Sequence, residues 1–301
     1  MRPHASWRGI YAPCFTPLTA DERLDAEAFE RAAHALLDER QAGLYVCGST
    51  GEGYALEDAV RCEAFRVAAR IGRERKARII AHVGSVPTRR ALAMARAAAD
   101  CGCDCVAAIP PAGGRYTYQE LTEYYAALAA GTPLPVLMYH IPELSGYDFS
   151  RPELSRWLEL PNVAGMKFTS LDLFKMERLI ALHPDKMIFH GSDQVLMYGA
   201  ALGATGAIGT TYNLAGTLAV GIFESAERSD LATARRLQGA LNSFIEAAHI
   251  NGGARVMKAL AAKRFGWASA RSAAPTREVS ASQIKEVECA LHAALHEEVH
   301  A

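Results

Sequence analysis

The sequence predicts an α/β fold, a (β/α)8 (TIM) barrel followed by a helical extension. Short apolar runs alternate with amphipathic segments over residues 1–229. The amphipathic segments carry apolar residues at spacings of three and four, which is the helical period. Eight strand–helix units in about 228 residues are the number that a (β/α)8 barrel requires. Their regular alternation argues against separate α and β domains.

The strands are expected at eight short apolar runs: residues 9–14, 43–47, 78–83, 104–109, 135–139, 163–167, 186–190 and 205–209. Helices are expected between them, for example in "DAEAFERAAHALLDER" and "TRRALAMARAAADCG". Several helical segments end in glycine, which commonly stops a helix.

The C-terminal part of the chain is expected to be helical. "DLATARRLQGALNSFIEAAHI" and "SASQIKEVECALHAALHEEVH" have helical periodicity, and the turn-rich segment "GWASARSAAPTREVS" separates them. We therefore expect a barrel over residues 1–229 that carries the active site. Residues 230–301 are expected to pack on it as a helical extension.

The composition is that of an ordinary soluble globular protein, with 50% hydrophobic and 22% charged residues. A net charge of -1 does not indicate a nucleic-acid or membrane surface. No apolar run is long enough for a signal peptide or a membrane-spanning helix, so a cytoplasmic protein is expected. The seven cysteines are expected to be reduced thiols. The alternating "CGCDC" (101–105) is interpreted as small buried residues, because a strand sends alternate side chains to opposite faces.

Lys167 ends the apolar run in "PNVAGMKFTS". Only seven of the 32 basic residues are lysines, so this chain usually supplies positive charge with arginine. A lysine, unlike an arginine, loses its proton when desolvated and can then attack a carbonyl carbon. The alternative is a strand-end lysine whose ammonium reaches solvent, and this stretch alone favours that alternative.

Other polar residues follow the ends of the expected strands, which is where (β/α)8 barrels carry their chemistry. They are Ser49 and Thr50 in "GSTGEG", Tyr139, Thr169, Asp193 and Gln194 in "GSDQ", and Thr210 and Thr211 in "GTTYN". Together with Lys167, these groups predict a pocket for a small oxygen-rich molecule.

These residue types suit a 2-oxo acid. A neutral lysine forms a Schiff base with a ketone, and the protonated imine stabilises the enamine that forms when the C–C bond β to it breaks. Tyr139 can move the proton that this step needs. Ser49, Thr50 and the backbone N–H groups around Gly51 suit a carboxylate. Ser49 and Thr50 are also compatible with capping the following helix, as is Asp193 with an N-cap.

Three other patterns are interpreted as structural or incidental. His82 and His140 lie at strand ends and are expected to be satisfied structural histidines. "HEEVH" (296–300) matches H-E-x-x-H. However, a helix frays at the end of a chain and no third ligand follows, so no zinc site is expected. "GSTGEG" has the wrong spacing for a P-loop or a dinucleotide fingerprint.

Six longer motifs occur in an order shared with one enzyme family. They are "GLYVCGSTGEGYAL", "IAHVG", "YHIPELSG", "GMKFTSLDLFKMERL", "GSDQ" and "GATGAIGTTYN". The chain resembles, over nearly its whole length, the pyruvate-dependent class I aldolases of the dihydrodipicolinate synthase and N-acetylneuraminate lyase superfamily. The resemblance implies a Schiff-base lysine at Lys167, a catalytic tyrosine at Tyr139, and pyruvate carboxylate binding at Ser49 and Thr50. It also implies a homotetramer without a metal or organic cofactor.

Within this superfamily, "YHIPELSG", "KFTSLDLFKME" and "GTTYN" are most similar to the N-acetylneuraminate lyase branch. In that branch Thr169, Gly191, Asp193 and Thr210 would contact the sugar part of the substrate. The lysine-biosynthesis branch typically has an arginine, which helps to bind a second carboxylate, where this chain has Leu144. The resemblance therefore counts against aspartate semialdehyde as the partner of pyruvate.

Three positions depart from the sialic-acid branch. Gln194 stands where a glutamate is usual, which removes a charge and adds donors. Thr210 stands where a serine is usual, which adds a methyl group. The loop "PPAGGRYTY" has Gly113 or Gly114 where the family often has a tyrosine that reaches a neighbouring subunit, and Tyr116 lies nearby. These changes leave the lysine chemistry standing and open the question of which sugar fits.

Three functions remain open at this point. The first is retro-aldol cleavage of N-acetylneuraminate to N-acetylmannosamine and pyruvate. The second keeps the imine but acts on another 2-oxo sugar acid, by cleavage or dehydration, or in the manner of dihydrodipicolinate synthase. The third is a non-catalytic sensor of a 2-oxo acid, which would have no need of the nucleophile.

Overall fold

The fold is a closed barrel of eight parallel strands in a computed structural model that describes residues 5–111 and 113–299. Each strand pairs with the next along the chain, and β8 pairs with β1. The strands are β1 Gly9–Pro13, β2 Gly43–Val46, β3 Arg78–His82, β4 Cys105–Ala108, β5 Val136–His140, β6 Val163–Phe168, β7 Met187–His190 and β8 Gly206–Ile208. The predicted (β/α)8 barrel is confirmed.

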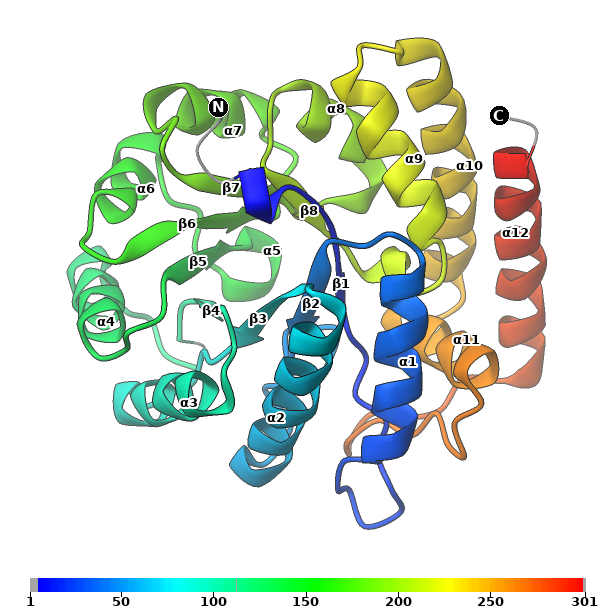
Figure 1. The fold of residues 1–301 in the computed structure, drawn as a ribbon, viewed down its shortest axis with the longest axis horizontal. Coiled ribbons are helices and arrows are strands. Elements are labelled where there is room, and N and C mark those ends of the chain that lie inside the picture. The colour runs from blue at the N-terminus through cyan, green and yellow to red at the C-terminus, as the bar shows by residue number, and fades with distance from the viewer. Residues whose placement is uncertain (1–4, 112, 300–301) are drawn as a thin grey trace.

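Helices surround the barrel and fill the connections between its strands (Figure 1). The helices of the barrel are α1 Ala26–Asp38, α2 Asp58–Arg75, α3 Thr88–Cys101, α4 Tyr118–Ala130, α5 Pro142–Ser145, α6 Arg151–Leu158, α7 Leu173–Leu182, α8 Leu196–Ala201 and α9 Gly216–Glu227. Short 3-10 turns lie at η1 Ala5–Trp7, η2 Asp193–Val195 and η3 Thr210–Asn213. The last two turns directly follow β7 and β8, so they lie at the carboxyl end of the barrel.

All eight expected strands are present, and their ends differ from the expected ends by one residue at most. The second strand shows why such differences arise. Cys47 was expected to end it, but this residue has a φ of 57°. A left-handed residue cannot continue a strand, so β2 ends at Val46.

Side chains along each strand alternate between the barrel interior and the surrounding helices. One cluster fills the interior: Tyr11, Tyr45, Ile80, Cys105, Ala107, Leu137, Met187, Phe189 and Ile208. A larger cluster lies between strands and helices, and on β6 it includes Met166 and Phe168. Lys167 lies between these two residues, so its side chain takes the opposite direction, into the barrel.

Three further helices, α10 Leu231–Ile250, α11 Ala254–Phe265 and α12 Ala281–Val299, follow the barrel. Helix α10 packs between α9 and α12, and α11 packs against α1 (Figure 1). The division at residues 229 and 230 stays a prediction. Within the described part of the chain, none of these or the other helices has the length and apolar character needed to cross a membrane.

Candidate active site

Lys167 is a buried cation at the carboxyl end of β6. Its side chain is only 5% exposed, which excludes the solvent-exposed alternative. The Nζ atom lies 4.2 Å from the centre of the Tyr139 ring and 5.0 Å from the centre of the Tyr45 ring. An ammonium over an aromatic face is attracted by the negative potential of the ring, so the two tyrosines fix the position of this amine.

Tyr139 and Lys167 are register partners on the adjacent strands β5 and β6. Burial raises the pKa of the Tyr139 hydroxyl, but the positive charge of Lys167 and the hydroxyls of Ser49 and Thr169 together outweigh that effect. The pKa of Tyr139 therefore lies below its ordinary value of 10.0. A tyrosine whose pKa is lowered gives up its proton more readily than a free one, so more of it is present as the phenolate that can act as a base.

The loop between β2 and α2 brings two hydroxyls to this pair. Ser49 Oγ lies 3.5 Å from the Tyr139 hydroxyl. Thr50 Oγ1 forms a 2.7 Å hydrogen bond with Thr210 Oγ1, from the loop after β8. Helix α2 has Glu57 at its N-cap position. Ser49 and Thr50 therefore do not cap this helix.

This loop is wound tightly by its backbone. Glu52 has a φ of 57°, and the Gly53 N–H donates to the Gly48 carbonyl over 3.0 Å. A Cβ at Gly53 would lie 1.8 Å from the Cys47 carbonyl oxygen, so only glycine fits. The Gly51 carbonyl accepts a 2.7 Å hydrogen bond from Thr16. The turn thus holds Ser49 and Thr50 on the barrel side of the chain.

Asp193 connects the loops after β7 and β8. Its Oδ2 accepts hydrogen bonds from the Thr211 N–H at 2.9 Å and the Thr211 hydroxyl at 2.7 Å. Burial raises the pKa of the Asp193 carboxyl, although these two bonds and the charge of Lys167 oppose the change. The carboxylate accepts from Thr211, and Val195 stands at the N-cap position of α8. Asp193 therefore does not cap that helix, and it fixes the turn that contains Thr210.

The other predicted substrate-binding residues lie at different depths. Thr169 Oγ1 is buried, and its interaction with the Tyr139 hydroxyl helps to lower the pKa of that tyrosine. Gly191 lies against Thr169, because a Cβ at this position would be 1.9 Å from Thr169 Oγ1 and 3.2 Å from Lys167 Cε. Gln194 is exposed. Thr169 and Gly191 are thus beside the amine, whereas Gln194 is open to solvent.

Tyr116 and Leu144 are not placed against the Lys167 amine by any contact in the structure. The Tyr116 N–H donates to the Tyr147 hydroxyl over 2.8 Å, and that hydroxyl donates to the Gly114 carbonyl over 2.9 Å. The loop after β4 is therefore tied to the segment after α5. Leu144, at the position discussed for a second carboxylate, is 54% exposed.

Two aromatic residues of the site were not predicted from the sequence. Tyr45 lies under Lys167, and the rings of Tyr45 and His82 both contact the Tyr139 ring edge-on. His82 Nε2 accepts a hydrogen bond from the Ile109 N–H. The sequence does contain an indication for Tyr45. Alternate residues of a strand share a face, and Tyr45 lies two residues before the end of the expected strand, so its side chain should point in the same direction as that of the last strand residue.

His140 differs in one respect from the satisfied histidine that was expected. Its Nε2 is buried without a hydrogen-bond partner among the described residues, and the Asp148 carboxylate lies 3.7 Å away. The ring packs against Phe149 and Phe168. Aromatic packing rather than hydrogen bonding holds this side chain.

The residues considered as metal ligands do not gather. Cys103 and Cys105 are buried as predicted, while Cys101 is partly exposed. In residues 5–111 and 113–299, no group of three His, Cys, Asp or Glu side chains is arranged to hold a metal ion. His300 of the "HEEVH" motif lies outside the described residues.

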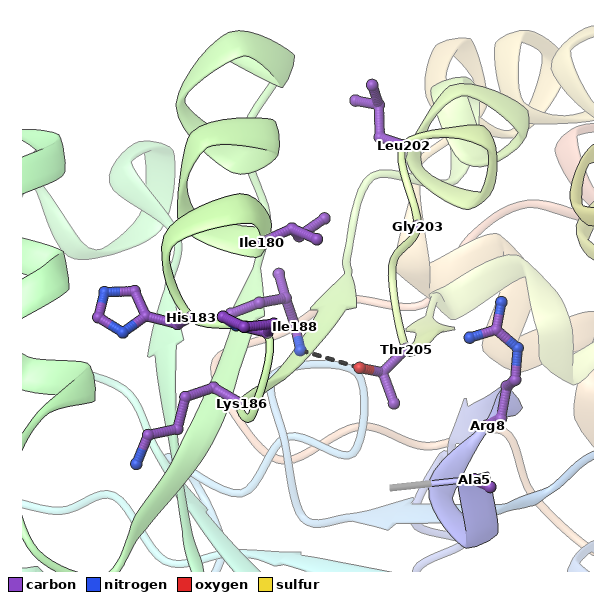
Figure 2. A pocket seen from close by; sticks show the side chains of 10 residues that line it. Ala5, Arg8, Ile180, His183, Lys186, Ile188, Leu202, Gly203 and Thr205 are labelled. Atoms are coloured by element: carbon purple, nitrogen blue, oxygen red, sulfur yellow. Dashed lines mark hydrogen bonds between the residues drawn. The ribbon is translucent and has the colours of Figure 1, made fainter. Parts of the chain in front are cut away.

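A separate cavity of about 390 Å³ opens at the other end of the barrel (Figure 2). Arg8, Lys186 and Thr205 contribute to its lining, and they directly precede β1, β7 and β8, respectively. Thr205 Oγ1 accepts from the Ile188 N–H, and Lys186 Nζ donates to the Val163 carbonyl. Because chemistry in (β/α)8 barrels sits at the carboxyl ends of the strands, we do not assign the reaction to this cavity.

Several solved structures similar to this one are named N-acetylneuraminate lyase. N-acetylneuraminate lyase from Fusobacterium nucleatum, complexed with pyruvate, matches with a TM-score of 0.89 at 29% identity over 97% of this chain and 98% of that chain. CdNal from Clostridium difficile, in complex with mannosamine, matches with a TM-score of 0.89 at 27% identity over 95% of this chain and 98% of that chain.

Sequence comparison agrees with the structural comparison. N-acetylneuraminate lyase from Salmonella typhimurium is 35% identical over 240 residues, which are 79% of this chain and 80% of that protein. The sequence model of the dihydrodipicolinate synthetase family matches residues 6–294. This match covers almost the whole barrel and the three helices after it, and the chain belongs to the dihydrodipicolinate synthetase family.

Proposed function

We propose that this protein is a class I aldolase that cleaves N-acetylneuraminate to N-acetylmannosamine and pyruvate. The observation that carries the proposal is the buried amine of Lys167, 4.2 Å from the centre of the Tyr139 ring at the carboxyl end of the barrel. The similar lyases support the substrate. One of the similar structures holds pyruvate and another holds mannosamine.

The carboxylate of the substrate would bind at Ser49, Thr50 and the backbone around Gly51. Ser49 lies 3.5 Å from the Tyr139 hydroxyl, so a carboxylate there has its C2 carbonyl near Lys167. Backbone N–H groups of a tight turn and neighbouring hydroxyls are suited to an anion. Binding at this loop thus orients the ketone for attack.

The reaction then proceeds through an imine. Lys167 gives up its ammonium proton, the resulting neutral amine adds to C2 of the open-chain sugar acid, and the C2 oxygen leaves as water. Tyr139 takes the proton of the C4 hydroxyl, and its lowered pKa suits this role. The C3–C4 bond breaks, its electron pair moves into the protonated imine, and C4 leaves as the aldehyde of N-acetylmannosamine. Protonation of the enamine at C3 and hydrolysis release pyruvate and the free amine.

The sugar part would extend toward the loops after β6, β7 and β8. Thr169 offers a buried hydroxyl beside Tyr139, and Gly191 leaves room beside it. Asp193 holds the turn of Thr210 through Thr211. Gln194 would meet the far end of the polyol tail, because it is exposed.

Borohydride trapping tests the proposal. The protein is incubated with N-acetylneuraminate and no added pyruvate, reduced, and mapped by peptide mass spectrometry. A pyruvate-sized adduct on Lys167 is expected, since only cleavage produces it. No adduct, with free pyruvate still trapped on Lys167 in a parallel sample, would reject this sugar and retain the imine chemistry.

A second candidate is cleavage or dehydration of another 2-oxo sugar acid through the same imine. The observation in its favour is Gln194, which carries an amide rather than a carboxylate. Release of N-acetylmannosamine from N-acetylneuraminate separates the two candidates. The exposed side chain of Leu144 offers no positive charge for a second substrate carboxylate, which counts against a dihydrodipicolinate synthase reaction.

Replacing Lys167 by arginine separates an enzyme from a sensor. Arginine retains the charge but forms no imine at neutral pH, so Lys167→Arg is expected to lower kcat by about 10³-fold or more. Lys175→Arg is the matched control, since Lys175 lies on α7 and pairs with Asp148 on the surface side. A sensor would show no turnover in the unmodified protein and would retain ligand binding in Lys167→Arg.

We also propose a homotetramer that acts in the cytoplasm without a metal or organic cofactor. The seven cysteines are free in the structure, which fits a reducing compartment. The imine supplies the electron sink that a cofactor would otherwise supply. Light scattering of the purified protein measures the assembly, and a monomer at micromolar concentration would contradict the tetramer.

A further inference from the structure

A buried ion pair links the carboxylate-binding loop to the helices after the barrel. Lys258 on α11 is 1% exposed, and its Nζ lies 2.6 Å from Oε1 of Glu52. The same oxygen accepts from the Ser272 hydroxyl at 3.1 Å, and Oε2 accepts from the Ala273 N–H at 3.0 Å. Both oxygens of Glu52 are therefore held by residues more than 200 positions away in the chain.

Glu52 is part of the turn that presents Ser49 and Thr50. Its N–H donates to the Ser49 carbonyl over 3.1 Å. Its φ of 57° is a conformation that a residue with a side chain rarely adopts. Such a backbone persists when the surroundings hold it, and here the surroundings are Lys258, Ser272 and Ala273.

We propose that Glu52 and Lys258 are positioning residues, whose ion pair holds the carboxylate-binding turn, residues 48–53, in the geometry that brings Ser49 to Tyr139. This inference rests on the proposed function, because it assigns the turn to the substrate carboxylate. It gives the helical extension a part in the active site through the contact of Lys258 with Glu52.

The energetics of a buried pair favour this role over simple stabilisation. Two charges lose their hydration on burial, and an apolar pair of the same volume is often as stable or more stable. Burial lowers the pKa of Lys258, and the carboxylate of Glu52 opposes this change. The ion pair of Glu52 and Lys258 forms only when residues 48–53 have the observed conformation. The pair therefore favours that one conformation of the turn, beyond any effect on stability.

The test compares two lysines on the same helix. Lys258→Met removes the pair with Glu52, whereas Lys263→Met removes the exposed pair of Lys263 with Glu288 on α12. We expect Lys258→Met to raise KM for the 2-oxo acid about tenfold, because small displacements of binding groups cost up to about a hundredfold. The imine chemistry is intact, so kcat should change much less. Lys263→Met should leave both constants at wild-type values.

A double variant separates positioning from stability. Lys258→Met alone leaves a buried carboxylate without its cation and lowers Tm. In Glu52→Gln/Lys258→Met both charges are gone, so we expect Tm to recover while KM stays high. Recovery of KM together with Tm would overturn the proposal, as would a KM of Lys258→Met within twofold of wild type.

Hydrogen exchange gives a readout that does not depend on the reaction. The amides of Glu52 and Gly53 donate within the turn, and they should exchange faster in Lys258→Met but not in Lys263→Met. If the wild type traps no pyruvate on Lys167, the proposed function fails, and this measurement alone decides the positioning role. Unchanged exchange of residues 48–53 would then overturn it.

Discussion

Tyr139 and Lys167 act on each other because they are register partners on adjacent strands. The amine lies over the tyrosine ring, and its charge, together with the Ser49 and Thr169 hydroxyls, more than offsets the effect of burial on the Tyr139 pKa. One aromatic residue thus positions the amine and can also exchange a proton with the substrate. The pairing needs only that a tyrosine and a lysine occupy inward positions at the same height of the barrel.

Replacing Tyr139 by phenylalanine tests the second of these roles. The ring would remain under the amine, while the hydroxyl that moves the proton would be lost. We expect kcat for N-acetylneuraminate to fall by about 10²–10⁴-fold, the usual contribution of general acid–base catalysis. Pyruvate should still be trapped by borohydride, because the imine needs only Lys167.

Tyr124→Phe is the matched control for this substitution. Tyr124 is buried on α4 and packs in the cluster between the strands and the helices, outside the barrel interior. The Tyr124→Phe variant should turn over substrate at the wild-type rate. Equal activity of Tyr139→Phe and Tyr124→Phe would show that Tyr139 moves no proton.

At the scale of single residues, the site residues at strand ends could be predicted from the sequence. The residues that hold them in position could not. Lys167 and Tyr139 were predicted because each ends an apolar run. Tyr45 was missed because an aromatic residue inside a strand is ordinary core material. The Thr211 bonds to Asp193 were missed because they join residues 18 positions apart in different loops.

At the scale of elements, glycines set how closely the strand-end loops approach each other. Gly191 follows β7 and leaves the space that Thr169 Oγ1 occupies. Gly209 follows β8, and a Cβ there would lie 2.0 Å from Asp193 Oδ1. The sequence shows a glycine after each of these strands. Which side chain packs against each glycine depends on how the closed barrel brings the loops together, so it could not be predicted.

Gly191→Ala is expected to disturb the site without unfolding the barrel. Its Cβ would lie 1.9 Å from Thr169 Oγ1, so that side chain must rotate, and it would crowd Lys167 Cε at 3.2 Å. We expect kcat/KM to fall by about tenfold to a hundredfold, since reacting groups displaced by about 1 Å lose that much. Steady-state kinetics and the rate of imine trapping measure the effect.

Gly239→Ala on α10 is the control for that change. A Cβ at Gly239 meets nothing within 4 Å, so alanine should stabilise the helix by about 0.5–1 kcal/mol relative to glycine. Activity should be unaffected. If Gly191→Ala retained wild-type kinetics, the close contact of Thr169 and Gly191 would have no bearing on the reaction.

At the scale of the whole molecule, closure of the barrel brings residues that are far apart in the sequence close together in space. Ser49, Tyr139 and Lys167 come from the second, fifth and sixth strand–helix units and meet at one end of the barrel. The alternation of elements predicted this meeting, because every strand contributes its carboxyl end to the same face. The contact of Lys258 with Glu52 spans 206 positions and follows from no periodicity, so only the structure reveals it.

Three buried histidines make the stability of the whole chain sensitive to acid. Burial lowers the pKa of His82 to about 3, and those of His140 and His190 to about 4, from an ordinary value of 6.5. Below pH 6.5 the unfolded chain therefore binds protons that the folded chain does not. The stability from these groups is present above pH 6.5 and is lost as the pH falls toward 4.

We therefore expect the free energy of unfolding to fall between pH 6.5 and about 4.5, by up to about 1.4 kcal/mol per pH unit for each histidine. The raised pKa of Asp193 acts in the opposite direction and makes the slope shallower. Urea unfolding at constant ionic strength measures the slope. His140→Gln should reduce it, because one of the three protons is no longer taken up on unfolding. A stability that is constant over this range would show that the buried rings are protonated in the folded protein.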